Sequence, residues 1–265
     1  MNHTSKYPCL YCIMYKNENG EWIGSNELRT WQSIIKNKSD WLTIGKGKKA
    51  TRQQFFNCVN DPLIGDGSDQ PILDFVAPPP LHLELALNLN SILDSLLTIW
   101  PELEIWTDML HLVFAPYHGM VLKGNQCEKF LKHLEVMAEW IPSDFEEYLV
   151  LLRSFKSVLD SCCRAKGLSE DYKTCLDSFS DAALAVKEKF DMSLIPKLHI
   201  IMEHVGYYCD KYQVSLGRYF EQELEACHST FDKMWRSQFM MKNPKDPKYG
   251  PRLLKCVLTY VNQNI

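Results

Sequence analysis

Apolar residues recur at helical spacing through most of the chain beyond residue 80, and this pattern limits the possible folds more than any other feature. From Leu81 to Leu97, leucine and isoleucine return every three or four residues, which places them on one face of an α-helix. Ser143 followed by Glu146 has the spacing of a capping box at a helix start. We therefore predict a mainly α fold. Further helices are predicted at about 125–140, 143–166, 169–190, 196–213, 216–236 and 249–263.

The first 80 residues have a different composition. They hold half of the 12 glycines and several turn signals, so we expect an irregular, partly β region at 1–80. The dipeptide Asn19-Gly20 predicts a short hairpin, and a helix is predicted near Glu27 to Lys36. Residues 81–265 are predicted to form a helical domain that makes one structural unit with this N-terminal region.

Two short motifs near opposite ends of the chain contain residue types that bind metal ions. Cys9 and Cys12 form a C-x-x-C, and His199 and His204 form an H-x-x-x-x-H; both spacings are used at tetrahedral zinc sites. Positions five apart on an ideal helix diverge by roughly 140°, so one histidine must lie at a helix end or the helix must be distorted. The alternatives are a redox or chance C-x-x-C and two histidines that are ordinary interior residues.

A zinc hydrolase is a poor reading of the histidine motif. The sequence "HIIMEH" is neither H-E-x-x-H nor H-x-x-E-H, because Glu203 neighbours the second histidine and one extra residue separates the pair. Four protein ligands would also fill every position of a tetrahedral zinc ion and leave none for water. A zinc ion in this chain would therefore be structural.

The overall charge argues against a dedicated nucleic-acid-binding protein. The formal net charge is −4 and the pI is near 6.1, whereas such proteins usually carry a strong basic excess. A local basic segment with Lys46, Lys48, Lys49 and Arg52 is the candidate DNA contact, and a solvated basic loop is the alternative. No secretory signal or membrane-spanning stretch is expected, so the ten cysteines indicate reduced thiols in an intracellular protein, nuclear or cytoplasmic.

The order of motifs along the chain resembles one branch of the DDE transposases, the Transib elements and the related catalytic subunit of the V(D)J recombinase. The resemblance rests on the C-x-x-C, a long helical insertion, the H-x-x-x-x-H and then "FEQELEACHSTF", which supplies Glu225-Ala226, His228 and Phe231. The segments "YPCLYC", "APPPLHLEL", "GNQCEKFL" and "FEQELEACH" are also similar to motifs of uncharacterised transposon-derived invertebrate proteins. These segments are spread over most of the chain in the matching order.

This resemblance implies roles for particular residues. Cys9, Cys12, His199 and His204 would bind one zinc ion, and Glu225, with Glu221 as the next candidate, would descend from the glutamate that holds catalytic divalent metals. The two aspartates that complete such a site precede the C-x-x-C in the family, and only eight residues precede Cys9 here. Four aspartates after the motif match no family position: Asp61, Asp66, Asp69 and Asp74.

The sequence thus predicts a zinc-clasped helical protein derived from a transposase and catalytically inactive by itself. Magnesium would bind only if a complete catalytic site were assembled. DNA, a protein partner or a second copy of the chain are the expected partners, and no membrane association is expected. The alternative function is a protein-interaction module with a structural zinc ion and no role on DNA.

Overall fold

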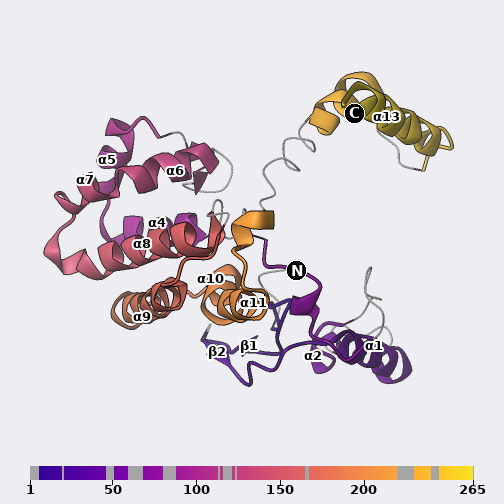
Figure 1. Ribbon diagram of the computed structural model, residues 1–265, viewed down its shortest axis with the longest axis horizontal. Coiled ribbons are helices and arrows are strands. Elements are labelled where there is room, and N and C mark those ends of the chain that lie inside the picture. Colours follow the sequence, from indigo (N-terminus) through magenta and orange to yellow (C-terminus); the bar gives the residue numbers. More distant parts are fainter. Residues whose placement is uncertain are drawn as a thin grey trace. The chain divides into compact units, whose positions relative to one another are not determined.

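The computed structural model of the protein (Figure 1) is mainly helical, as predicted. The chain forms two compact units, Met1–Tyr219 and Phe220–Ile265. The predicted division at residue 80 rests on composition and stays a prediction. The structure describes residues 6–19, 21–45, 51–58, 68–79, 88–112, 114–115, 121–122, 124–164, 167–219, 230–239 and 245–264.

The elements follow one another as α-helices, short strands, and 3-10 or π-helical segments, the last two marked η. In the first unit they are β1 (Tyr15–Lys16), β2 (Trp22–Ile23), α1 (Trp31–Asp40), η1 (Trp41–Gly45), α2 (Thr51–Gln54), η2 (Ile72–Asp74), α4 (Asn88–Ile99), α5 (Leu103–Met109), β3 (Phe114–Ala115), β4 (Val121–Leu122), α6 (Gly124–Lys132), α7 (Leu134–Ala138), η3 (Ser143–Phe145), α8 (Glu146–Val158), η4 (Leu159–Cys163), α9 (Tyr172–Phe190), α10 (Pro196–Ile200), η5 (Ile201–Val205), α11 (Gly206–Tyr212) and η6 (Leu216–Tyr219). In the second unit they are η7 (Trp235–Phe239) and α13 (Tyr249–Asn264).

The helix pair α8–α9 is central to the first unit, and α4 packs against α8. Their facing sides are apolar because the buried side chains recur at helical spacing. Phe155 of α8 and Phe179 of α9 are fully buried, and their ring centroids lie 5.8 Å apart. The predicted helices at 143–166 and 169–190 are thereby confirmed in their main parts.

Two details of the helix starts and ends differ from the prediction. The capping box at Ser143 is wrong: Pro142 precedes a 3-10 turn at this point, and α8 begins only at Glu146, without a side-chain cap. The predicted helix at 125–140 is interrupted at His133. The Nδ1 atom of His133 lies 2.8 Å from the carbonyl oxygen of Lys129, the acceptor that the His133 amide would use in a continuous helix.

The N-terminal region contains the predicted hairpin. Strands β1 and β2 pair antiparallel, with Lys16 opposite Trp22. Helix α1 begins at Trp31, four residues later than predicted, because the preceding residues are extended and Thr30 caps the helix. The Thr30 hydroxyl accepts a hydrogen bond from the Ser33 amide at 3.0 Å, and the Ser33 hydroxyl accepts one from the Thr30 amide at 3.0 Å.

A continuous helical rod of three segments, α10, η5 and α11, follows α9 and confirms the helix predicted at 196–213. Pro196 occupies the first helical position, where its missing N–H costs nothing. The middle segment, η5, is π-helical. The rod lies close to the N-terminal hairpin (Figure 1), and the Trp22 indole N–H donates to the Leu194 carbonyl just before the rod at 2.8 Å.

In the second unit, helix α13 confirms the helix predicted at 249–263. It packs against η7, where the rings of Trp235 and Tyr249 meet edge to face with centroids 5.5 Å apart. The predicted helix at 216–236 begins as η6, and its middle lies outside the described residues. Among the residues that the structure describes, no helix is both long enough and apolar enough to cross a membrane.

Candidate metal centre

The two cysteines lie on a short turn ahead of strand β1, and backbone contacts define this turn. The Tyr11 amide donates to the Cys9 Sγ atom at 3.3 Å. The Arg29 side chain donates through Nε to the Cys12 carbonyl at 2.7 Å, and the Arg29 amide donates to the Tyr11 carbonyl at 2.8 Å. Both thiols are fully buried. The turn therefore presents two sulfur atoms to the interior of the unit.

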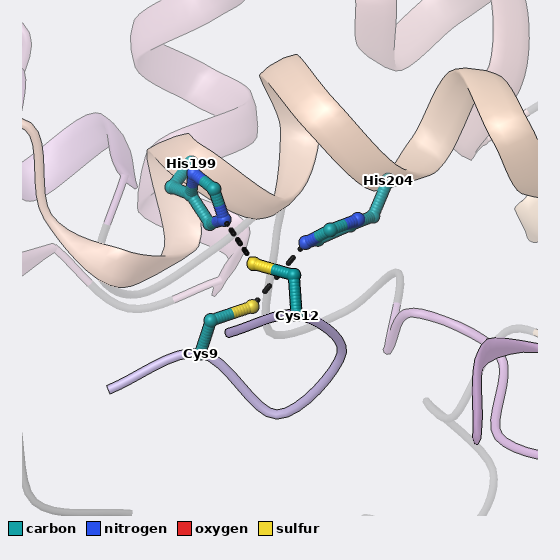
Figure 2. Close-up of side chains that lie close together, drawn as sticks. All are labelled: Cys9, Cys12, His199 and His204. Atoms are coloured by element: carbon teal, nitrogen blue, oxygen red, sulfur yellow. Dashed lines mark hydrogen bonds between the residues drawn. The ribbon is translucent and has the colours of Figure 1, made fainter. Parts of the chain in front are cut away.

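The two histidines lie on the helical rod, and the π-helical segment brings them onto one side. His199 belongs to α10 and His204 to η5. In a π-helix the hydrogen bonds join residues five apart rather than four, so residues with this separation stack along the same face. This is the helix distortion that the H-x-x-x-x-H spacing requires. Figure 2 shows both imidazole rings pointing toward the cysteine turn.

The four side chains form one compact cluster. Cys9 Sγ lies 3.3 Å from His204 Nε2, and Cys12 Sγ lies 3.2 Å from His199 Nε2 (Figure 2). One ligand atom from each residue can be chosen so that all four lie within 4.8 Å of one another, and all four residues are buried. A tetrahedral zinc ion with ordinary Zn–S and Zn–N bonds has ligand atoms roughly 3.3–3.8 Å apart. The cluster is therefore close to the size that one such ion needs.

The protonation of the thiols is set by their contact with each other. The hydrogen bond from Cys12 holds the pKa of Cys9 well below its ordinary value, and His199 and His204 act in the same direction. The same hydrogen bond raises the pKa of Cys12 well above its ordinary value, and burial adds to this effect. The pair thus releases one proton readily and retains the other. A bound cation would replace the retained proton, because metal ligation requires thiolates.

Aromatic rings enclose the two histidines. The Trp22 indole stacks on His199 with centroids 4.0 Å apart and planes 9° apart. Tyr11 meets His204 edge-on at 5.5 Å, and the two imidazoles meet edge to face at 5.0 Å. The Nδ1 atom of His204 is buried without a hydrogen-bond partner. Packing against rings therefore orients both imidazoles.

The structure brings together the four residues predicted as zinc ligands, and it leaves the other predicted site residues untested. Of the predicted DNA-contacting residues, Arg52 lies in α2, but its side chain is not described. Of the four aspartates without a family position, Asp74 forms an ion pair with Lys211, 2.6 Å from Oδ2 to Nζ. The remaining candidates lie outside the described residues: Lys46, Lys48, Lys49, Glu221 and Glu225.

The sequence analysis missed Trp22. This residue stacks on a histidine 177 positions further along the chain, and tryptophan is common in cores, so no local pattern could indicate its role. The fold and the cluster together define a mainly helical protein with a buried two-cysteine, two-histidine cluster that could hold a metal ion. No protein-family model matches the sequence, and a comparison with curated proteins finds no significant relative.

Proposed function

We propose that the protein binds one structural zinc ion through Cys9, Cys12, His199 and His204. The observation that carries this proposal is the convergence of four buried ligand side chains from segments 187 and 195 residues apart. Sulfur and imidazole ligands suit zinc, whereas calcium and magnesium take oxygen ligands. All four tetrahedral positions would be filled by protein, which is the arrangement of structural rather than catalytic zinc sites.

The zinc ion would join the N-terminal turn to the helical rod. A cross-link between residues 187 positions apart removes a large loop from the unfolded ensemble. By the chain-entropy relation for cross-links, closing such a loop stabilises the folded state by about 5 kcal/mol. Because no preformed site exists in the unfolded chain, zinc binding and docking of the N-terminal region would be coupled.

The direct test is the metal content of the purified protein, measured by elemental analysis. We expect about one zinc ion per chain and almost none in the Cys9→Ser plus Cys12→Ser variant. Cys175→Ser is the matched thiol control, because Cys175 is only partly buried and lies outside the cluster, and it should keep its zinc. Full zinc content in the double variant would contradict the proposal.

We further propose that this zinc-clasped chain derives from a transposase of the type that its motifs resemble. Support comes from the ligand set: the residues that the resemblance assigns to zinc are the four that lie together. In this proposal Glu225 is a vestigial metal ligand. One carboxylate binds magnesium weakly, because that ion keeps its waters unless several carboxylates and phosphates replace them. The chain by itself would then be inactive on DNA and would serve as a DNA- or protein-binding part.

A nicking assay tests this second proposal. We expect no cleavage of supercoiled DNA by the purified chain in magnesium or manganese. The Glu225→Gln variant should bind as much zinc as the unmodified chain. Nicking that disappears in Glu225→Gln would show an active enzyme and overturn the vestigial role. If the protein associates with a protein partner and shows no affinity for DNA, the alternative function, a protein-interaction module, is favoured.

A further inference from the structure

His199 is oriented by a ring contact instead of a hydrogen bond. Metal-bound histidines usually donate their second ring N–H to a carboxylate, a carbonyl or water, which fixes the plane of the ring. Among the described residues, the side chain of His199 makes one hydrogen-bond contact, from Nε2 to Cys12 Sγ, and none through Nδ1. The parallel Trp22 indole at 4.0 Å covers one face of the imidazole. Such a stack restricts rotation of the ring about the bond that joins it to the side chain.

Trp22 is itself held in place by the segment that leads into the rod. Its Nε1–H donates to the carbonyl of Leu194, which lies five residues before His199. The opposite residue in the hairpin, Lys16, lies with Nζ 5.5 Å from the indole centroid and 3.4 Å from the Ser193 hydroxyl. The hairpin is therefore attached to residues 193–194 at two points, with the indole face directed at His199.

We propose that Trp22 is the positioning residue of the metal centre, and that the β1–β2 hairpin holds His199 in the orientation that directs Nε2 toward the metal ion. This inference rests on the proposed zinc site and goes beyond it, because Trp22 does not touch the metal. Loss of the indole frees the imidazole to rotate, so the metal dissociates faster while the number of ligands stays the same. Removal of an outer contact of this kind typically lowers metal affinity about 10- to 100-fold.

The experiment measures Co²⁺ affinity by competition with a chromophoric chelator, with Co²⁺ as a probe for a tetrahedral thiolate site. The Trp22→Leu variant should bind one Co²⁺ about 10- to 100-fold more weakly than the unmodified protein. Trp22→Phe, which keeps a stacking ring but loses the N–H, should recover most of the affinity. The matched control is Trp140→Leu, since Trp140 is 53% exposed and outside the cluster, and its affinity should not change.

Two spectroscopic readouts separate positioning from general destabilisation. The far-ultraviolet circular dichroism of Trp22→Leu should match that of the unmodified protein, whereas its Co²⁺ ligand-field bands should be altered. Equal affinity in Trp22→Leu and the unmodified protein would overturn the role of Trp22. So would an equally large loss in Trp22→Phe, which would assign the effect to the Leu194 hydrogen bond. Absence of stoichiometric Co²⁺ binding by the unmodified protein would instead overturn the metal site itself.

Discussion

The helix pair α8–α9 and the N-terminal region at residues 6–79 are stabilised in different ways. The helix pair buries long apolar faces, with Phe155 and Phe179 fully excluded from water. The N-terminal region has short elements, and its largest buried side chains, such as Tyr11 and Ile72, belong to a core that the helices share. One region has continuous apolar packing between its own elements, and the other depends on the surface against which it docks.

A small number of specific contacts attach the N-terminal region to the helices. The cysteine–histidine cluster is the largest of them. The Trp22 indole bonds to the Leu194 carbonyl, and the Asn26 amide donates to the Glu203 carboxylate at 2.7 Å. Such contacts are few and individually replaceable, whereas apolar burial is spread over many atoms. The comparison teaches that removing one contact can release the N-terminal region while the helix pair stays folded.

Metal removal should break the comparison most strongly. After zinc is extracted with a strong chelator, we expect residues 6–79 to lose hydrogen-exchange protection while residues 146–190 keep theirs. The loss of the closed loop should destabilise docking of the N-terminal region by about 5 kcal/mol. Hydrogen exchange with mass spectrometry measures both regions in one sample. Equal loss of protection in α8 and α9 would contradict the difference between the regions and indicate one cooperative unit.

A cavity in the helix pair should act on the other side of the comparison. Phe179→Ala removes a fully buried ring and should lower the free energy of unfolding by about 3–5 kcal/mol. The control is Leu184→Ala on the same helix, where the side chain is 49% exposed and the cost should stay below about 1 kcal/mol. Denaturant titration followed by circular dichroism checks both values. A cost for Phe179→Ala no larger than that of Leu184→Ala would show that this pair carries little of the stability.

The ion pair between Asp74 and Lys211 should give the smallest effect. The Asp74 side chain is only 5% exposed and also accepts from the Tyr207 hydroxyl at 3.2 Å, so Lys211→Met should cost about 1 kcal/mol. The hydrogen bond to Asp74 raises the pKa of Lys211. Its stabilisation is therefore complete below the ordinary lysine pKa and is lost as the pH rises through the folded value. Thermal unfolding of both proteins at pH 7 and above pH 10 measures this difference, which should shrink at the higher pH.

Local signals in the sequence predicted the helices, and long-range contacts decided what the sequence could not predict. Helices α8, α9 and α13 follow from apolar spacing within each segment. The start of α1 depends on Thr30, which forms a bridge with Pro71, a residue 41 positions away. No periodicity contains that information. The predicted helix start at Glu27 was therefore too early.

The candidate metal centre shows the same division. Cysteine and histidine are so few and so specific in their chemistry that their spacing alone suggested which four residues would meet. The packing around them was not predictable, because the stack of Trp22 on His199 and the edge contact of Tyr11 with His204 arise only after the chain has folded. Ligand identity was thus readable from the sequence, and ligand orientation was not.

The π-helical segment η5 has a consequence for changes in chain length. A π turn contains one more residue than an α turn, so the rod holds an extra residue between its two histidines. Deletion of Met202 would shorten the motif to H-x-x-x-H, and residues four apart share one face of a regular α-helix. A deletion at this point can therefore leave both imidazoles directed at the cysteines, whereas a deletion within α9 would rotate part of its apolar face out of the core. The centre of the rod is a place where the chain tolerates a change of length.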